Sequence, residues 1–525
     1  MKSGQRILKA TAINLTFSLT GKGLNYFALS ILVAHFFGAT WKTDSYVMGG
    51  IIPFWIMTVI LFGFNSCFIP VFIYYKNKFG DENARQLAAS FGFVSLVGLS
   101  LLIILGIGSA SLLIPFYSPG LDQAATALAV SMARWIFFSL FFYFLGALLS
   151  SIFYSYHRYE VPAIGSILLP LAIIINIVLL NKRIGIYSLV SGLICGQVCQ
   201  VLWMFSHVRD KTAFFRRKWD FRHPGIKKIF KLFGPIAVSC SVYPLYLIIT
   251  RMLASTLGEG NIANLDFATK IVLGITMTVT SAIAISILPT LSEIELLEER
   301  RTEELNRAIS LGVSVLSFVL VPIGFVLIAL RIPIVRLLLE RGAYLYDDSL
   351  VTSQALQFLA ITALIEPFNT VLMQVMFALK DTSRILLASI SGFVVNLVSA
   401  VVLVKSLKIA GLALSVPLGL FVQMLILFYI VKAKVKSLEA KTIFLSYGKV
   451  FFSAAVMALI VKIGFSWFEK IIPLNKSQNF LFLSTGLLVL IGGVIYILCL
   501  FLMKFKELRT IWQILIGKIR QKRSL

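Results

Sequence analysis

Apolar runs long enough to cross a membrane recur from one end of this chain to the other. A transmembrane helix needs about 20 apolar residues, because the hydrocarbon core of a bilayer is about 30 Å thick and a helix rises 1.5 Å per residue. Hydrophobic residues make up 58% of the 525 residues, and charged residues only 14%. None of the runs alternates in the manner of a barrel strand. The sequence therefore predicts an all-α polytopic membrane protein.

We predict fourteen spans, which form two parallel six-helix lobes plus two C-terminal helices: 11–37, 46–74, 88–114, 127–152, 161–180, 185–207, 232–254, 265–294, 308–330, 351–378, 385–404, 409–431, 450–469 and 480–503. The predicted domains are an N-lobe with a basic linker (1–228), a C-lobe (229–435), and spans 13 and 14 with a basic tail (436–525). A glycine, an aspartate and a proline recur about 220 residues apart, as Gly38, Asp44 and Pro70 and then Gly258, Asp266 and Pro289. Parallel repeats of this kind place a substrate cavity between the lobes.

The net charge of +25 would suggest nucleic acid as the partner of a soluble protein. Here the positive residues gather in alternate loops, with 33 Lys and Arg on one side of the predicted spans and 10 on the other. The positive-inside rule then places both termini in the cytoplasm. We therefore expect membrane lipids and no nucleic acid among the partners.

One polar stripe marks the first span. At 3.6 residues per turn, Asn14, Ser18, Lys22 and Asn25 lie on one face of the predicted helix. A lysine near the bilayer centre costs roughly 2.5–3.5 kcal/mol on insertion scales, so it should face a cavity or a partner. Lys270 stands on a similar stripe in the eighth span. Two such cations suit an anion, most naturally a phosphate or pyrophosphate.

The other ionisable groups inside the predicted spans are fewer and less regular: Arg134, Arg251, Asp266, Glu366 and Lys462. Glu366, beside Pro367, is expected to pair with a lysine, relay protons or bind a coupling ion. Arg251 either reaches the outer surface or serves the substrate path. No phosphate loop, catalytic or metal motif occurs, so we expect no enzyme and no cofactor. Cys195 and Cys199 share a helix face without a histidine or carboxylate nearby, which favours packing in a core over metal binding.

Motifs in a fixed order resemble the MurJ/MviN lipid II flippases of the MOP exporter superfamily. They run along nearly the whole chain: Phe37-Gly38-Ala39 with Thr43-Asp44, Pro53, Phe68-Ile69-Pro70, Ser118-Pro119-Gly120, Arg158 to Pro162, Phe233-Gly234-Pro235, Leu288-Pro289 to Ser292, and Leu339-Glu340-Arg341-Gly342-Ala343-Tyr344. Fourteen helices also resemble this family.

The resemblance implies alternating access by two lobes that move the undecaprenyl-pyrophosphate-linked peptidoglycan precursor across the bacterial cytoplasmic membrane, from the inner to the outer leaflet. Its cationic cavity would hold the pyrophosphate. Family arginines would fall at Gly23, Leu29 and Met57, whereas Lys270 keeps its charge and Lys22 lies one position from an expected site. The expected substrate-binding residues are Lys22, Lys270, Asn25, Ser18, Asp44, Arg251 and Glu366, with a coupling ion or the membrane potential as the driving force.

Three other functions stay open. The missing arginines favour a flippase for another polyprenyl-linked glycan, such as an O-antigen or exopolysaccharide unit. A cation-coupled multidrug antiporter would want buried carboxylates for cationic drugs, and the first six predicted spans hold no clear one. A membrane scaffold that recruits cell-wall enzymes through its basic loops would bind partners without moving lipid.

Overall fold

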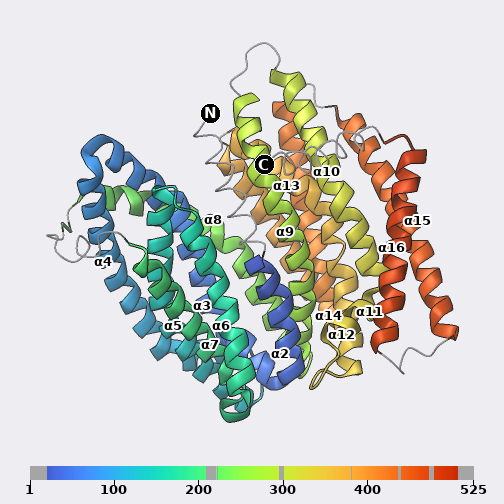
Figure 1. The fold of residues 1–525 in the computed structure, drawn as a ribbon, viewed down its shortest axis with the longest axis horizontal. Helices are drawn as coiled ribbons and strands as arrows, with labels where there is room; N and C mark the ends of the chain where they lie inside the picture. Colours follow the sequence, from blue (N-terminus) through green and yellow to red (C-terminus); the bar gives the residue numbers. More distant parts are fainter. Residues whose placement is uncertain are drawn as a thin grey trace. The chain divides into compact units, whose positions relative to one another are not determined.

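The computed structural model describes residues 20–208, 220–221, 223–294, 301–379, 381–435, 439–471 and 478–505. All regular structure in these ranges is helical, which confirms the predicted fold class (Figure 1). In chain order the elements are η1 (Leu24–Ala28), α2 (Leu29–Phe37), α3 (Trp41–Gly63), η2 (Phe64–Phe68), α4 (Ile69–Tyr117), α5 (Gln123–Ser155), α6 (Glu160–Ile184), α7 (Tyr187–Ser206), α8 (Pro224–Ser255), α9 (Asn261–Ile294), α10 (Arg301–Ala329), α11 (Arg331–Leu339), α12 (Tyr346–Leu359), α13 (Thr362–Ala378), α14 (Thr382–Lys434), α15 (Ala440–Ile471) and α16 (Gln478–Leu502).

Ten helices of the described chain are long and apolar enough to cross a membrane. Two of them, Trp41–Tyr117 with 77 residues and Ser383–Lys434 with 52, are far longer than one crossing requires. Each contains one residue with non-helical geometry, Gly80 (φ 88°) and Lys408 (φ 50°), where the sequence predicts a loop between spans. The multi-pass architecture is confirmed, and the count of fourteen spans stays a prediction.

The chain forms two compact units. Unit 1 contains Met1–Asp266 and the short segment Arg341–Tyr344, and unit 2 contains Phe267–Glu340 and Leu345–Leu525. The division falls inside α9, shortly after its first turn. The domain boundaries that we predict at residues 228 and 435 stay predictions.

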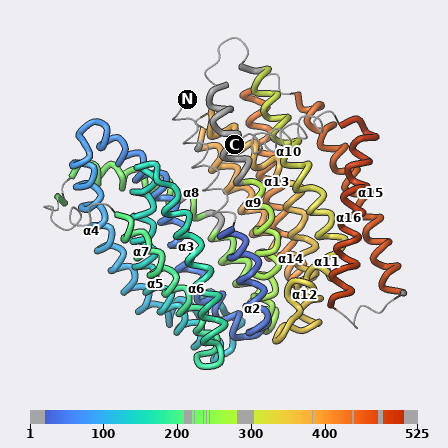
Figure 2. Tube along the Cα trace, in the orientation of Figure 1, coloured from blue at the N-terminus to red at the C-terminus, as the bar shows by residue number. Residues whose placement is uncertain are grey.

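In unit 1, α6 and α7 pack closely along each other (Figure 2). Glycines permit this approach: a Cβ atom on Gly192 would lie 2.6 Å from Ile173 Cα, and one on Gly196 would lie 2.9 Å from Leu169 Cα. Cys195 and Cys199 of α7 are exposed, so the prediction that they pack in a core is wrong. A thiol is a small apolar group, and the lipid-facing side of a membrane helix accommodates it without burial in protein.

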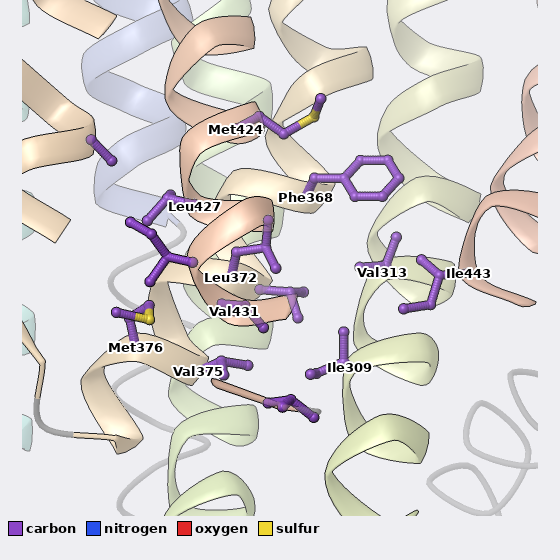
Figure 3. Close-up of a cluster of buried hydrophobic side chains, with 14 of the residues drawn as sticks. Ile309, Val313, Phe368, Leu372, Val375, Met376, Met424, Leu427, Val431 and Ile443 are labelled. Carbon is purple, nitrogen blue, oxygen red and sulfur yellow. The ribbon is translucent and has the colours of Figure 1, made fainter. Parts of the chain in front are cut away.

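The core of unit 2 lies where four helices, α10, α13, α14 and α15, converge. Figure 3 shows side chains from these helices meeting, among them Val313, Leu372, Leu427 and Ile443. Leu372 is 1% exposed and Leu427 is fully buried. This apolar cluster fixes α13, the helix that carries Glu366, against α14.

Candidate functional site

Three turns of unit 1 meet in what we call the interhelical junction: the α2–α3 turn, the α8–α9 turn and the segment Arg341–Tyr344. Asp44, in the first turn of α3, is 1% exposed. Its carboxylate accepts hydrogen bonds from Gly260 N at 2.6 Å and from Ala263 N at 2.7 Å. The first amides of an α-helix have no partner within the helix, and its N-terminus favours negative charge. Asp44 therefore caps the start of α9 from a different helix.

The capping is reciprocal. Trp41 N, at the start of α3, donates a hydrogen bond to Glu259 Oε1 at 3.0 Å, just before α9 begins. The hydroxyl of Thr43 donates to Gly38 O at 2.8 Å and closes the turn that precedes α3. The first turn of α3 is thus capped by the carboxylate of Glu259, just before α9, and the first turn of α9 is capped by the carboxylate of Asp44 on α3.

The segment Arg341–Tyr344 completes the junction. Ala343 N donates to His35 O at 2.9 Å, and the phenol of Tyr344 donates to Asn264 Oδ1 at 3.1 Å. Gly38 has a φ of 63°, and a Cβ atom there would lie 2.4 Å from Ala343 O. A glycine is required at this position, because a side chain would be strained and would collide with backbone.

A buried ion pair lies close in sequence to the α8–α9 turn of the interhelical junction. The guanidinium of Arg251 on α8 forms an ion pair with the carboxylate of Asp266, and their side chains are 15% and 6% exposed. A buried ion pair whose members were separated would leave an uncompensated charge, so this pair holds α8 to the start of α9. Asp44 and Arg251, both expected to serve the substrate, are engaged in contacts between helices.

Lys22 is half-buried and lies two residues before Leu24, where the π-helical turn η1 begins. The helix passes close to α6 here, since a Cβ atom on Gly21 would lie 3.5 Å from Ser166. Asn25 lies within the π turn and is exposed. Ser18, like Asn14, lies outside the described residues. A π turn interrupts the 3.6-residue period, so the polar stripe does not continue in phase from Lys22 to Asn25.

Lys270 belongs to unit 2 and is half-buried on α9. Further along the same helix, the Thr278 hydroxyl donates a hydrogen bond to the Gly274 carbonyl oxygen at 2.7 Å. Glu366 is partly buried on α13, and one of its carboxylate oxygens accepts a hydrogen bond from the Thr370 hydroxyl at 3.1 Å. A lysine ammonium supplies three donors and a point charge to phosphate oxygens. Lys22 and Lys270 can each act in this way.

The interhelical junction was missed by the sequence reasoning. Two of its three turns contain motifs that carry the resemblance, but the turns lie far apart in the chain and nothing local indicates that they touch. The only signal was the pair of short Gly-containing turns at corresponding places of the internal repeat. Aspartates of that repeat, Asp44 and Asp266, turn out to have different partners.

Comparison with known proteins gives a consistent result. The sequence model of the family described as "Lipid II flippase MurJ" matches residues 33–482. A lipid II flippase MurJ of Burkholderia cenocepacia is 26% identical over 410 residues, covering 76% of this chain and 79% of that protein. A probable lipid II flippase MurJ of Thermotoga maritima is 24% identical over 485 residues, covering 92% and 93%.

Solved structures agree on the fold. A lipid II flippase MurJ in an inward closed conformation superposes with a TM-score of 0.75 at 20% identity, covering 94% of this chain and 97% of that one. An inward-facing MATE family transporter of the MOP superfamily superposes with a TM-score of 0.61 at 16% identity, covering 80% and 95%. The family model spans most of the chain, including all three turns of the interhelical junction. The chain belongs to the lipid II flippase MurJ family.

Proposed function

We propose that this protein is a lipid II flippase, which moves the undecaprenyl-pyrophosphate-linked peptidoglycan precursor from the inner to the outer leaflet of the bacterial cytoplasmic membrane. The observation that carries the proposal is the family match over residues 33–482. Buried contacts made by Asp44 and Tyr344, two residues of the motifs that resemble the family, support it. The protein acts as a transporter and catalyses no covalent reaction.

Lys22 and Lys270 each carry a positive charge that can bind the pyrophosphate. An anionic head group loses its hydration in a membrane, and cations held by the protein replace part of it. Asn25, which is exposed, and Ser18 add polar contacts to the head group. Asp44 and Arg251 act by positioning helices, as their hydrogen bonds and ion pair favour.

Both termini lie in the cytoplasm, as the distribution of Lys and Arg favours. With this orientation, an anionic head group moving outward from a negative interior gains about 2.3 kcal/mol per elementary charge per 100 mV. The membrane potential therefore drives transport in the required direction, with or without a coupling ion.

A flippase for another polyprenyl-linked glycan is the second candidate. Gly23, Leu29 and Met57 are uncharged where the family resemblance implies arginines, which favours a different head group. The multidrug antiporter has support only in the fold of MATE transporters, at 16% identity. No observation favours the scaffold.

The test is complementation of a bacterium depleted of its own lipid II flippase, with lipid II measured in the outer leaflet. The wild-type chain should restore growth and outer-leaflet lipid II. Lys22→Ala combined with Lys270→Ala should abolish both at equal membrane abundance. Lys182→Ala, which removes an exposed lysine at the end of α6, is the matched control and should leave transport intact.

Two results would count against the proposal. Full activity of the folded double variant would remove the lysines from the substrate path. A well-inserted wild-type chain that does not rescue growth would exclude lipid II and leave the other polyprenyl-linked glycans.

A further inference from the structure

Glu366 lies on α13 within the candidate membrane span Tyr346–Ala378. Its hydrogen-bond partner is the Thr370 hydroxyl, one helical turn further along, at 3.1 Å. None of the ion pairs formed by the described residues includes Glu366. A carboxylate within a membrane span that has no cationic partner is costly, so the charge of Glu366 must be balanced in another way.

Asn369 lies three residues after Glu366 and shares its face of α13. The side chain is 2% exposed, and its Nδ2 donates to Leu420 O of α14 at 3.1 Å. Its Oδ1 is buried and accepts no hydrogen bond among the described residues. Buried polar atoms in native proteins almost always have a partner, so this oxygen lacks a donor.

Apart from the Thr370 hydroxyl, the described residues give Glu366 no hydrogen-bond donor or ion-pair partner, and they give Asn369 Oδ1 no donor. On the side of α14, Gln423 Nε2 contacts Met373 Sδ at 3.7 Å and Ser389 Oγ at 3.5 Å. On the side of α15, the phenol of Tyr447 donates to Leu364 O at 2.8 Å. Much of the remaining contact surface of α13 is the apolar cluster of Figure 3.

No described charged side chain on the helices of unit 2 near α13 forms an ion pair with Glu366. Arg307 on α10 pairs with Glu303 and Glu304, and Asp381 before α14 pairs with Arg384 and Lys434. The other described side chains that carry charge on α9, α10, α12, α14 and α15 form no ion pair with Glu366: Lys270, Asp347, Asp348, Lys405, Lys408, Lys432, Lys441, Lys449, Lys462, Glu469 and Lys470.

We propose that Glu366 and Asn369 form a proton-binding site, in which the protonated Glu366 carboxyl donates its O–H to Asn369 Oδ1. A single proton removes the charge of Glu366 and gives Asn369 Oδ1 a hydrogen-bond donor. The Thr370 hydroxyl donates to the other carboxyl oxygen, and the Leu420 carbonyl orients the Asn369 amide. The position of each group is therefore fixed by a hydrogen bond that the structure contains.

The proposal deepens the proposed function, because it names the proton as the coupling ion and places it in unit 2. Release of the proton leaves a carboxylate beside an amide oxygen. Both are hydrogen-bond acceptors, and their negative charges repel each other. Deprotonation therefore requires α13 and α14 to move relative to each other or water to enter. A change in the proton load of Glu366 thus becomes a change in helix packing.

The test is infrared spectroscopy of the purified full-length protein in lipid nanodiscs. The spectrum of the wild-type protein minus that of Glu366→Gln should contain the C=O stretching band of one protonated carboxylic acid at neutral pH. In Asn369→Leu the band should move to higher frequency, because the carboxyl loses its hydrogen-bond acceptor. Glu160→Gln, which removes a carboxyl that is paired with Arg158, is the matched control and should leave the band unchanged.

Absence of the band, or a band that is identical in Asn369→Leu, would overturn the proposal. Asn369→Leu keeps Glu366, so it tests the site even if Glu366→Gln does not fold. Loss of the band when NaCl replaces choline chloride at constant pH would overturn the proton as the coupling ion, since an alkali ion would then displace it from the site. The readout needs no lipid-linked substrate, so its failure is distinct from a failure of the flippase proposal.

Discussion

The bond between Asp44 and the start of α9 is the contact of the interhelical junction that can be tested most directly. Asp44→Asn keeps the size of the side chain and removes its charge. The carboxylate accepts two amide hydrogen bonds, from Gly260 and Ala263, and hydrogen bonds to charged groups contribute about 1.5–3 kcal/mol each. An asparagine oxygen retains one acceptor, so we expect a loss of about 2–3 kcal/mol. At about 1.4 kcal/mol per factor of ten, the start of α9 should open roughly 30 to 140 times more often.

Hydrogen exchange followed by mass spectrometry measures this opening in the purified protein. Peptides that contain residues 258–266 should exchange roughly 30 to 140 times faster in Asp44→Asn. Asp122→Asn is the matched control, because Asp122 caps α5 by accepting from Ala125 N at 2.7 Å. It should accelerate exchange at the start of α5 and leave residues 258–266 unchanged. If Asp44→Asn changes exchange there by less than threefold, the cap does not hold α9 and the reasoning fails.

Gly260→Ala should lower the melting temperature strongly, because Gly260 has a φ of 79° and a Cβ atom would lie 2.3 Å from Ala39 O; a thermal melt equal to wild type would contradict this. Burial lowers the pKa of His223, whose Nδ1 accepts from Gly225 N and whose Nε2 lies 3.1 Å from Asn83 Oδ1. The protonated ring is therefore disfavoured in the folded protein, and the stability that the neutral ring contributes is complete above about pH 6.5 and is lost as the pH falls through the lowered pKa. His223→Asn keeps a capping acceptor but does not titrate, so thermal melts between pH 5 and 7 should show a smaller pH dependence than wild type; equal slopes would contradict this.

Several residues of the motifs that resemble the family form the contacts of the interhelical junction. Gly38, Thr43 and Asp44 on one side, and Gly342 to Tyr344 on the other, form turns and caps at the interhelical junction. These contacts position helices and carry no chemistry toward a head group. The candidate cations, Lys22 and Lys270, belong to other elements. The residues that indicate the family and those proposed to bind its substrate are therefore separate sets.

The sequence by itself determined the class of the fold and most helices. An apolar run of about 20 residues has few alternatives to a helix in a membrane, because backbone polar groups must bond within the segment there. The ends of α6, α7 and α16 lie within a few residues of the predicted spans. Breaks at Gly80 and Lys408 fall where polar residues separate two predicted spans. These features depend on local composition, which the sequence contains in full.

Only the tertiary structure decided what the polar residues touch. Asp44 is expected from the sequence to bind the substrate. In the structure its carboxylate accepts hydrogen bonds from backbone amides more than 200 positions away. The sequence also contained no sign of the π turn that contains Asn25. Nor did it indicate that Asn369 donates to Leu420 O while its own Oδ1 accepts no hydrogen bond among the described residues. The physical reason is that helix formation is satisfied within a segment, whereas a buried charge or amide is satisfied by whichever segment packs against it.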